Sequence, residues 1–168
     1  MTLLVISDTH GRSDRVREVL RIHPEASAVI FLGDGLRDLP EELVISERPK
    51  LYAVSGNCDP YTLSGFFLGE EALLSFGSPY RFLLMHGHRH GVKSGREHAL
   101  AYASVRGADV LLYGHTHVPE ERYFPADEGR RPMWIFNPGS LGAPHGDAPS
   151  YGLIQIRSGQ LLFSHGTI

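Results

Sequence analysis

The sequence predicts an α/β fold made of two packed sheets with helices on the outside. In residues 1–60, short apolar runs alternate with segments of helical periodicity, and the connections are short, as in strand–helix–strand units. In the second half, β-type runs predominate and are separated by turn residues. Polar residues that can bind metal follow several of these strands, where ligands of α/β folds bind.

The first part of the chain is expected to contain three strands and two helices. Apolar runs at residues 3–6 and 28–32 are typical of strands covered on both faces, and residues 50–54 form a third strand. Residues 13–23 repeat apolar side chains at helical spacing, and a short helix is predicted over residues 39–45. The expected buried face of the first helix consists of Val16, Val19, Leu20 and Ile22.

Further along the chain, residues 66–68 and 72–76 are two apolar runs, expected to pair as a hairpin or to cross a sheet edge. A strand at 80–85, a helix at 94–105 and a buried strand at 110–113 follow. Four more runs predict hairpin strands, at 121–125, 133–136, 151–157 and 160–164.

Length and composition point to one globular domain. The 168 residues suit a single domain over residues 1–168. With 42% hydrophobic and 21% charged residues, the composition is close to that of globular proteins and indicates neither a disordered nor a membrane protein. A net charge of −3 predicts no strong affinity for nucleic acid, so a phosphate-bearing ligand needs a local positive source. Bound metal ions could be that source.

The first strand and the single cysteine predict a cytoplasmic protein. Polar Asp8 follows the first apolar run too soon for a cleavable leader, and no run has the roughly 18 apolar residues of a membrane span. Cys58 is the only cysteine, so no internal disulfide can form.

Residues of metal-ligand type follow five of the predicted strands. The sequence Gly114-His115-Thr116-His117 comes directly after one strand, and side chains two residues apart in an extended segment share a face. One such pair alone is weak support, because a surface loop can carry it by chance. Five strand ends of this kind predict a metal site. The candidate ligands are Asp8, His10, Asp34, Asn57, His86, His115 and His117.

Seven ligands are too many for one ordinary transition metal and suit two ions that share a carboxylate. Two divalent ions outweigh the carboxylates of Asp8 and Asp34 and a bridging hydroxide, which leaves a positive site that would attract a phosphate ester. Imidazole and carboxylate ligands suit manganese, iron, zinc, cobalt or nickel, and ligand type does not choose between them.

The ordered set of these residues resembles the signature of the calcineurin-like metallophosphoesterases. It comprises Asp8-x-His10, Gly33-Asp34, Gly56-Asn57, His86-Gly87 and Gly114-His115-Thr116-His117. The short chain and His86-Gly87-His88 are similar to the small bacterial and archaeal phosphodiesterases of the YfcE type. The resemblance implies the metallo-dependent phosphatase fold, a four-layer α/β/β/α sandwich of two mixed sheets.

The same resemblance implies a dinuclear phosphodiesterase with two divalent transition-metal ions, manganese first among them. It places Asp8, His10 and His117 on one ion and Asn57, His86 and His115 on the other, with Asp34 bridging. A metal-bridging hydroxide is then the nucleophile, and no side chain is assigned with certainty as a catalytic residue. The substrate would be a small phosphate ester or a nucleotide-like molecule.

Cys58 departs from the pattern of the wider family. Many members carry histidine there, and the resemblance implies that this histidine protonates the leaving group or contacts the phosphate. A thiol with an ordinary pKa of about 8.5 is a poor proton donor, so a small buried filler and a catalytic thiol both stay open. Asn57, Cys58 and His88 are the residues expected to contact substrate.

The remaining polar candidates have simpler explanations. His23, His98 and His165 are expected to be surface or cap residues, while His145 could reach the cleft or face solvent. Residues 137–140 form a tight turn, which the resemblance places near the metals.

A protein-binding scaffold like the retromer subunit Vps29, which shares the fold, is the alternative function. Loss of metal ligands would favour the scaffold, and all seven are present here, so the enzyme is preferred. Homo-oligomerisation is left open.

Overall fold

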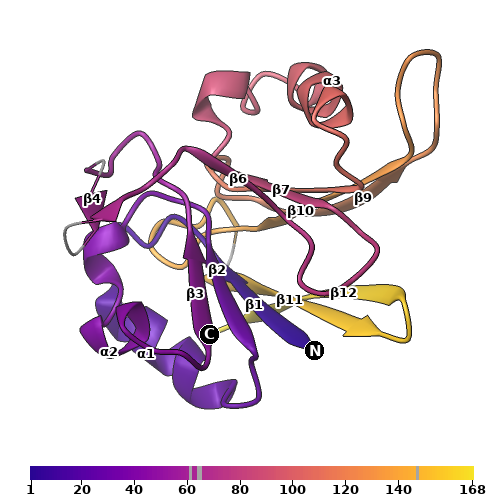
Figure 1. Ribbon diagram of the computed structural model, residues 1–168. Helices are drawn as coiled ribbons and strands as arrows, with labels where there is room; N and C mark the ends of the chain where they lie inside the picture. Colours follow the sequence, from indigo (N-terminus) through magenta and orange to yellow (C-terminus); the bar gives the residue numbers. More distant parts are fainter. Residues whose placement is uncertain (61, 64–65, 147) are drawn as a thin grey trace.

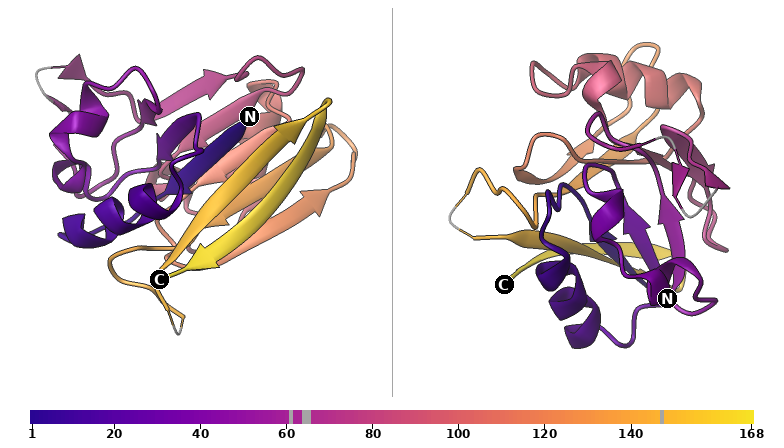
Figure 2. Two further views of the ribbon diagram at one scale, coloured as in Figure 1. Left: turned by 90° about the horizontal axis from the view of Figure 1, so that it is seen from below. Right: turned by 90° about the vertical axis from the view of Figure 1, so that its left-hand side faces the viewer.

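The computed structural model describes residues 1–60, 62–63, 66–146 and 148–168, and in it two five-stranded sheets pack face to face with helices outside (Figures 1 and 2). This arrangement is the α/β/β/α sandwich, so the predicted fold class is confirmed.

The first sheet combines both ends of the chain in the order β12-β11-β1-β2-β3. Its parallel part follows the alternating pattern, with β1 at Thr2–Ile6, β2 at Ala28–Phe31 and β3 at Lys50–Ala53. The hairpin of β11 (Ser150–Arg157) and β12 (Gln160–Thr167) joins this sheet antiparallel to β1, as the left view of Figure 2 shows.

The second sheet has the order β6-β7-β8-β10-β9. Its central strands β7, β8 and β10 are parallel, and β6 and β9 pair antiparallel at the edges. The strands are β6 (Glu71–Leu74), β7 (Phe82–Met85), β8 (Val110–Tyr113), β9 (Pro119–Phe124) and β10 (Met133–Pro138).

Helices cover the outer faces of both sheets (Figure 1). Helices α1 (Ser13–Ile22) and α2 (Glu41–Val44) lie on the first sheet, and α3 (Glu97–Val105) lies on the second. Two 3₁₀ turns, η1 (Leu36–Asp38) and η2 (His88–His90), follow strand ends. Among the described residues, no helix combines the length and apolar character needed to cross a bilayer.

Three apolar clusters separate the four layers. Strand β1 shows how the alternation of side chains builds them, because Leu3 and Val5 pack between the sheets while Leu4 and Ile6 pack against α1. All four are fully buried. A third cluster joins α3 to the second sheet, with Leu83 and Leu100 among its members. The continuous apolar runs of the central strands therefore reflect burial on both faces.

Some predicted details are wrong. Ile22 is 39% exposed, because it lies about 120° around the helix axis from Val16 and so leaves the buried stripe. The two short runs in residues 66–76 do not pair with each other: β5 (Phe66–Phe67) pairs with β4 (Thr62–Leu63), whereas β6 pairs with β7. The helix predicted at 39–45 is shorter, since Pro40 precedes its first turn at Glu41.

Candidate metal centre

The residues predicted as ligands lie together at one end of the sandwich. Because β1, β2 and β3 are mutually parallel, as are β7 and β8, the carboxyl ends of these strands share an edge in each sheet. In chain order, Asp8 and His10 follow β1, Asp34 follows β2, Asn57 follows β3, His86 follows β7, and His115 and His117 follow β8.

Asp8, His10 and His117 form one group that could hold an ion. The His117 Nε2 atom lies 3.2 Å from both Asp8 Oδ1 and His10 Nε2, and His10 Nε2 lies 3.9 Å from Asp8 Oδ1. Ligands bound at about 2.1 Å around one ion are separated by about 3.0–3.4 Å. The group therefore needs little rearrangement to bind a cation.

Asp34, His86 and His115 form a second such group. The His86 Nε2 atom lies 3.3 Å from Asp34 Oδ2 and 3.1 Å from His115 Nδ1. Asp34 also has a carboxylate oxygen within 4.8 Å of ligand atoms of His10 and Cys58. Asp34 thus reaches toward both groups, as a bridging carboxylate must.

One oxygen of Asp8 is buried without a hydrogen-bond partner in the described structure. The Oδ2 atom accepts hydrogen bonds from the Ser7 hydroxyl at 2.6 Å and the His115 amide at 2.9 Å. The Oδ1 atom accepts none, although imidazole nitrogens of His10, His86 and His117 lie 3.2–3.9 Å away. An unpaired buried carboxylate oxygen is costly, and a bound cation would satisfy it.

Backbone carbonyls orient two of the imidazoles. His86 Nδ1 donates to the Leu32 carbonyl at 2.7 Å, and His117 Nδ1 donates to the Ala143 carbonyl at 2.6 Å. Since a carbonyl only accepts, the proton is on Nδ1 in both rings, and in the neutral form Nε2 keeps its lone pair toward the carboxylates.

Left-handed backbone conformations concentrate at the site. The affected ligands are Asp8 (φ 53°), His10 (φ 42°), Asp34 (φ 60°), His115 (φ 67°) and His117 (φ 60°). Residues other than glycine rarely adopt such angles, which cost energy and persist where the surrounding structure enforces them. The loops hold their side chains in position at the expense of local stability.

The carboxylates and imidazoles shift each other's ionisation. Burial disfavours charge on Asp34 and on His86, but their mutual interaction outweighs it, so the pKa of Asp34 is lowered and that of His86 is raised. Asp8 raises the pKa of His117. Burial, and then His86 and Lys93, lower the pKa of His115 to about 4.

Glycines allow the loops to approach these carboxylates closely. A Cβ atom on Gly56 would lie 2.1 Å from Asp34 Oδ1, and one on Gly114 would lie 2.1 Å from the Ser7 hydroxyl oxygen and 2.8 Å from Asp8 Oδ2. Any side chain at either position would displace a ligand or its hydrogen-bond partner.

Asp59 is a positioning residue that the sequence analysis missed. Its carboxylate accepts hydrogen bonds from the amides of four residues in the loops after β2 and β3: Asp34 (2.6 Å), Gly35 (2.8 Å), Leu36 (2.8 Å) and Gly56 (2.9 Å). The available signal was an aspartate in a glycine-containing turn two residues after Asn57, because such residues commonly bind nearby amides.

Asn137 supports the segment Gly114–His117 in a similar way, by side-chain hydrogen bonds. Its buried side chain donates to the Gly114 carbonyl and to the Thr116 hydroxyl, both at 3.0 Å. The Ser140 hydroxyl donates to the Asp8 carbonyl at 2.7 Å. Residues 137–140 therefore lie beside the candidate ligands, as the resemblance implied. The predicted tight turn is wrong for Asn137 and Pro138, which end strand β10.

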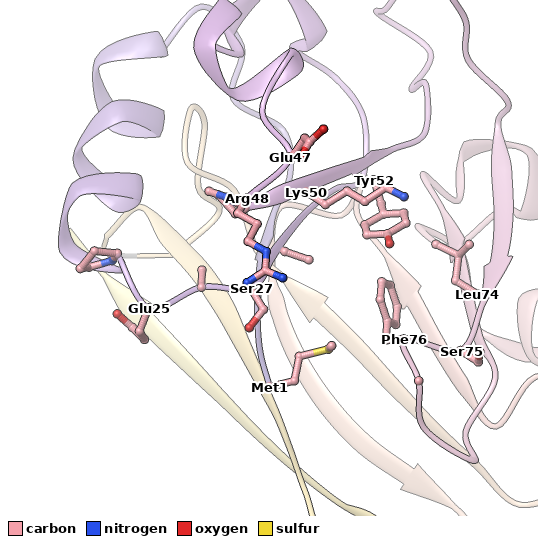
Figure 3. A pocket seen from close by; sticks show the side chains of 15 residues that line it. Met1, Glu25, Ser27, Glu47, Arg48, Lys50, Tyr52, Leu74, Ser75 and Phe76 are labelled. Carbon is pink, nitrogen blue, oxygen red and sulfur yellow. The ribbon is translucent and has the colours of Figure 1, made fainter.

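Two hollows lie at opposite ends of the parallel strands. A hollow of about 470 Å³ adjoins the candidate ligands and is lined by His10, Gly11, Asp34, Gly35, Arg37, Asp38, Asn57, Cys58, Asp59 and Pro60. A larger one of about 870 Å³ (Figure 3) lies where β2 and β3 begin and is lined by residues such as Ser27, Lys50 and Tyr52. None of the predicted ligands lines the larger hollow, so the smaller one is the candidate substrate site.

Comparison with known proteins agrees with this geometry. The family model of the calcineurin-like phosphoesterase superfamily domain matches residues 1–159. The chain belongs to this superfamily. Proteins of the family are metallophosphoesterases, which fits a site able to hold divalent ions.

Two bacterial members of the superfamily are similar along most of the chain. The "Probable metallophosphoesterase YsnB" of Bacillus subtilis (strain 168) is 34% identical over 148 residues, which is 86% of this chain and 77% of YsnB. The "Phosphodiesterase YfcE" of Escherichia coli (strain K12) is 32% identical, with 92% of this chain and 87% of YfcE covered.

Solved structures of other proteins have the same fold. A predicted phosphoesterase from Streptococcus pneumoniae TIGR4 matches with a TM-score of 0.76 at 27% identity, over 99% of this chain and 88% of that one. Vps29 of Chaetomium thermophilum matches with a TM-score of 0.70 at 18% identity, over 100% of this chain and 95% of that one. The second similarity concerns the fold alone.

Cys58, which occupies the position where many superfamily members carry histidine, lies beside the candidate metal centre. The prediction of a buried filler is wrong, because Cys58 is exposed at the rim of the hollow. Its amide donates to Asp34 Oδ1 at 2.8 Å, while its sulfur accepts from the side-chain amide of Asn57 at 3.2 Å. Burial of part of the thiol, and then Asp34, raise the pKa of Cys58, so the thiol is neutral near pH 7.

Asn57 and His88 lie near the candidate centre. The side chain of Asn57 is exposed and lines the smaller hollow. His88 begins the turn η2 after Gly87 and does not continue strand β7. Its ring centroid is nevertheless only 5.4 Å from that of His86 and 6.1 Å from that of His115.

The other histidines have mainly structural contacts. His23 follows the end of α1, and its Nε2 atom lies 2.9 Å from the Tyr151 hydroxyl. The exposed His165 stacks on Phe136. His145 differs, because its ring centroid lies 4.9 Å from that of His117, at the edge of the candidate centre.

Proposed function

We propose that this protein is a phosphodiesterase that hydrolyses small or nucleotide-like phosphate esters at a dinuclear metal centre. The observation that supports it most directly is the buried, unpaired Asp8 Oδ1 atom, which faces three imidazoles. Similarity to YfcE, which is named a phosphodiesterase, supports the choice of diesters.

The proposed ligands divide between two ions. Asp8, His10 and His117 would hold one, and Asn57, His86 and His115 the other, with Asp34 bridging. The donor set fits, since all seven are nitrogen or oxygen ligands and no thiolate is required. When bound, two divalent ions, of which manganese is our first choice, would polarise the phosphate ester and lower the pKa of the attacking water.

The protein's own residues would arrange the reaction around these ions. The lowered pKa of Asp34 keeps its carboxylate charged over the working pH range. The Leu32 carbonyl orients the His86 ring by accepting a hydrogen bond from its Nδ1 atom, and the Ala143 carbonyl orients the His117 ring in the same way. Asn57, Cys58 and His88 are the proposed substrate contacts. Because the Cys58 thiol is neutral and weakly acidic, we assign it no proton transfer.

A Vps29-like scaffold is the second candidate, favoured by the shared fold along the whole chain. The complete ligand set argues against a purely structural role, since a scaffold has no need of five strained loop positions around an unpaired carboxylate oxygen. A cytoplasmic location stays a prediction, and homo-oligomerisation stays open.

A panel of phosphate esters tests the proposal. Protein freed of metal by chelation and reloaded with manganese, iron, zinc, cobalt or nickel is assayed with bis(4-nitrophenyl) phosphate, aryl methyl phosphates and 4-nitrophenyl phosphate. We expect diester hydrolysis with at least one ion, and a loss of more than about 10²-fold in Asp8→Asn, comparable to loss of a major electrostatic contribution. No turnover with any ester and ion would favour the scaffold.

A further inference from the structure

The hollow beside the candidate centre has a cationic side chain on its wall, at Arg37. Residues proposed to bind metal or substrate, such as His10, Asp34 and Cys58, line the same hollow. Arg37 is the only lysine or arginine among the described residues that line it. The side chain is exposed, so it is accessible to a molecule in the hollow.

In the described part of the chain, Arg37 forms no ion pair and no side-chain hydrogen bond. Asp38 Oδ2 accepts from the Thr9 hydroxyl at 2.5 Å and the Gly11 amide at 2.8 Å. The Asp59 carboxylate accepts from four amides. Asp38 Oδ2 and the Asp59 carboxylate are therefore bonded to the loops, and the Arg37 guanidinium has no carboxylate partner among the described residues.

The backbone on both sides of Arg37 is anchored. On one side, Leu36 is fully buried and its amide donates to Asp59 Oδ1 at 2.8 Å. On the other, Asp38 ties η1 to the loop after β1 through its contacts with Thr9 and Gly11. The guanidinium consequently extends from a fixed point beside the proposed ligands.

A guanidinium in this position recognises a particular kind of substrate. It binds carboxylate and phosphate with paired hydrogen bonds, whereas the scissile phosphate would be taken by the ions. A simple diester would leave Arg37 without a partner. We propose that Arg37 selects substrates that carry a second anionic group, a phosphate or a carboxylate, beyond the scissile phosphate; this rests on the proposed function.

Binding of three matched compounds to the metal-loaded protein, measured by calorimetry, tests the selection. Glycerol 3-phosphate has one anionic group, 3-phosphoglycerate adds a carboxylate, and glycerol 1,3-bisphosphate adds a phosphate. For the wild type we expect one or both of the compounds with a second anion to bind about 10–100-fold more tightly than glycerol 3-phosphate, the effect of a charged hydrogen-bonded pair. The preferred compound identifies the second group.

Variants separate the role of Arg37 from general attraction to the ions. Arg37→Gln should abolish most of the preference while binding glycerol 3-phosphate within about 2-fold of the wild type, and Arg37→Lys should retain part of it. The control is Arg17→Gln, which removes an exposed arginine on α1 that pairs with Glu42 on α2. This variant should keep the full preference. Thermal melting confirms that each variant is folded.

The proposal is overturned if the wild type shows no preference, or if Arg37→Gln keeps it in full. Failure of the proposed function has a different result, because the ester panel would then show no hydrolysis while the calorimetric preference could still be present.

Discussion

At the scale of the residue, Asp34 is the side chain on which both halves of the proposed centre depend. Its carboxylate contacts His86 and belongs to a group with His10. We expect Asp34→Asn to weaken the binding of both ions by more than the about 10–100-fold that loss of an outer hydrogen-bond partner costs. His117→Ala should weaken mainly one. Elemental analysis after dialysis measures this, and clean loss of a single ion from Asp34→Asn would contradict the bridging role.

Cys58 predicts a dependence on the leaving group. With no acid at this position, hydrolysis should slow steeply as the pKa of the leaving group rises, because charge on the departing oxygen is not neutralised. Cys58→His should flatten this dependence and raise rates with the poorest leaving groups about 10²-fold or more. The measurement is the rate for a series of aryl phosphates, with Cys58→Ser as the control. An unchanged slope in a variant that binds both ions would refute this explanation.

The histidines predict a pH dependence of metal binding. An ion needs neutral imidazoles, and the pKa values of His86 and His117 are raised above the ordinary 6.5. Protons therefore occupy these rings at pH 6.5 and below, and metal must displace them, so affinity should fall as pH decreases through this range. His115, with a pKa of about 4, should contribute nothing there. Calorimetry of manganese binding in buffers of different ionisation enthalpy counts the protons, and none released at pH 6 would contradict the prediction.

At the scale of the element, one side chain joins the ends of two strands. Asp59 binds amides from the loops after β2 and β3, which carry Asp34 and Asn57. Asp59→Asn replaces one carboxylate oxygen, which accepts hydrogen bonds, by an NH₂ group. This group can only donate, and it would face the backbone N–H groups that now donate to Asp59. We expect a loss of about 2 kcal/mol or more in the free energy of unfolding, because each unsatisfied group costs about 1–3 kcal/mol, and weaker metal binding.

Urea unfolding of metal-free protein measures the stability effect of Asp59→Asn. Asp14→Asn is the matched control, since it removes an exposed carboxylate of α1 that pairs only with Arg12 in the described structure. Equal stability of the two variants would show that Asp59 does not hold the loops together.

At the scale of the whole molecule, the proposed ions connect the two sheets. Asp8, His10, Asp34 and Asn57 follow strands of the first sheet, whereas His86, His115 and His117 follow strands of the second. Ions that bind only the folded chain stabilise it, by about 2.7 kcal/mol per site at a free concentration 100 times Kd.

Chelation should therefore lower the Tm of wild-type protein by about 5–10 °C for each site, given about 2–4 °C per kcal/mol for a chain of this size. Calorimetric scans with and without a chelator measure the change. Asp8→Asn, which removes the charge of one proposed ligand, should show a smaller shift. If the Tm of the wild type is the same with and without metal, the proposal that bound ions stabilise the fold by connecting the two sheets is contradicted.

The sequence by itself determined the elements and the set of candidate ligands. Strand β8 has the predicted bounds, and β1 and β10 differ from prediction by one and two residues, because side-chain periodicity and turn residues are local properties. The ligand types could also be predicted, since each lies within four residues of the end of a strand and the carboxyl ends of parallel strands meet at one edge. The metal assignments and the single domain stay predictions.

Only the tertiary structure decided which elements become neighbours. The hairpin of β11 and β12 pairs with β1, which is far away in the sequence, so local patterns do not predict this pairing. Strand β5 pairs with β4 and not with β6, and the sequence does not distinguish these partners because the runs are similarly apolar. The hydrogen bonds between backbone amides and Asp59 could not be predicted from the sequence either. The same is true of the position of Arg37 in the wall of the smaller hollow. A side chain's partners are set by packing in three dimensions, whereas the sequence pattern records only its own burial and local conformation.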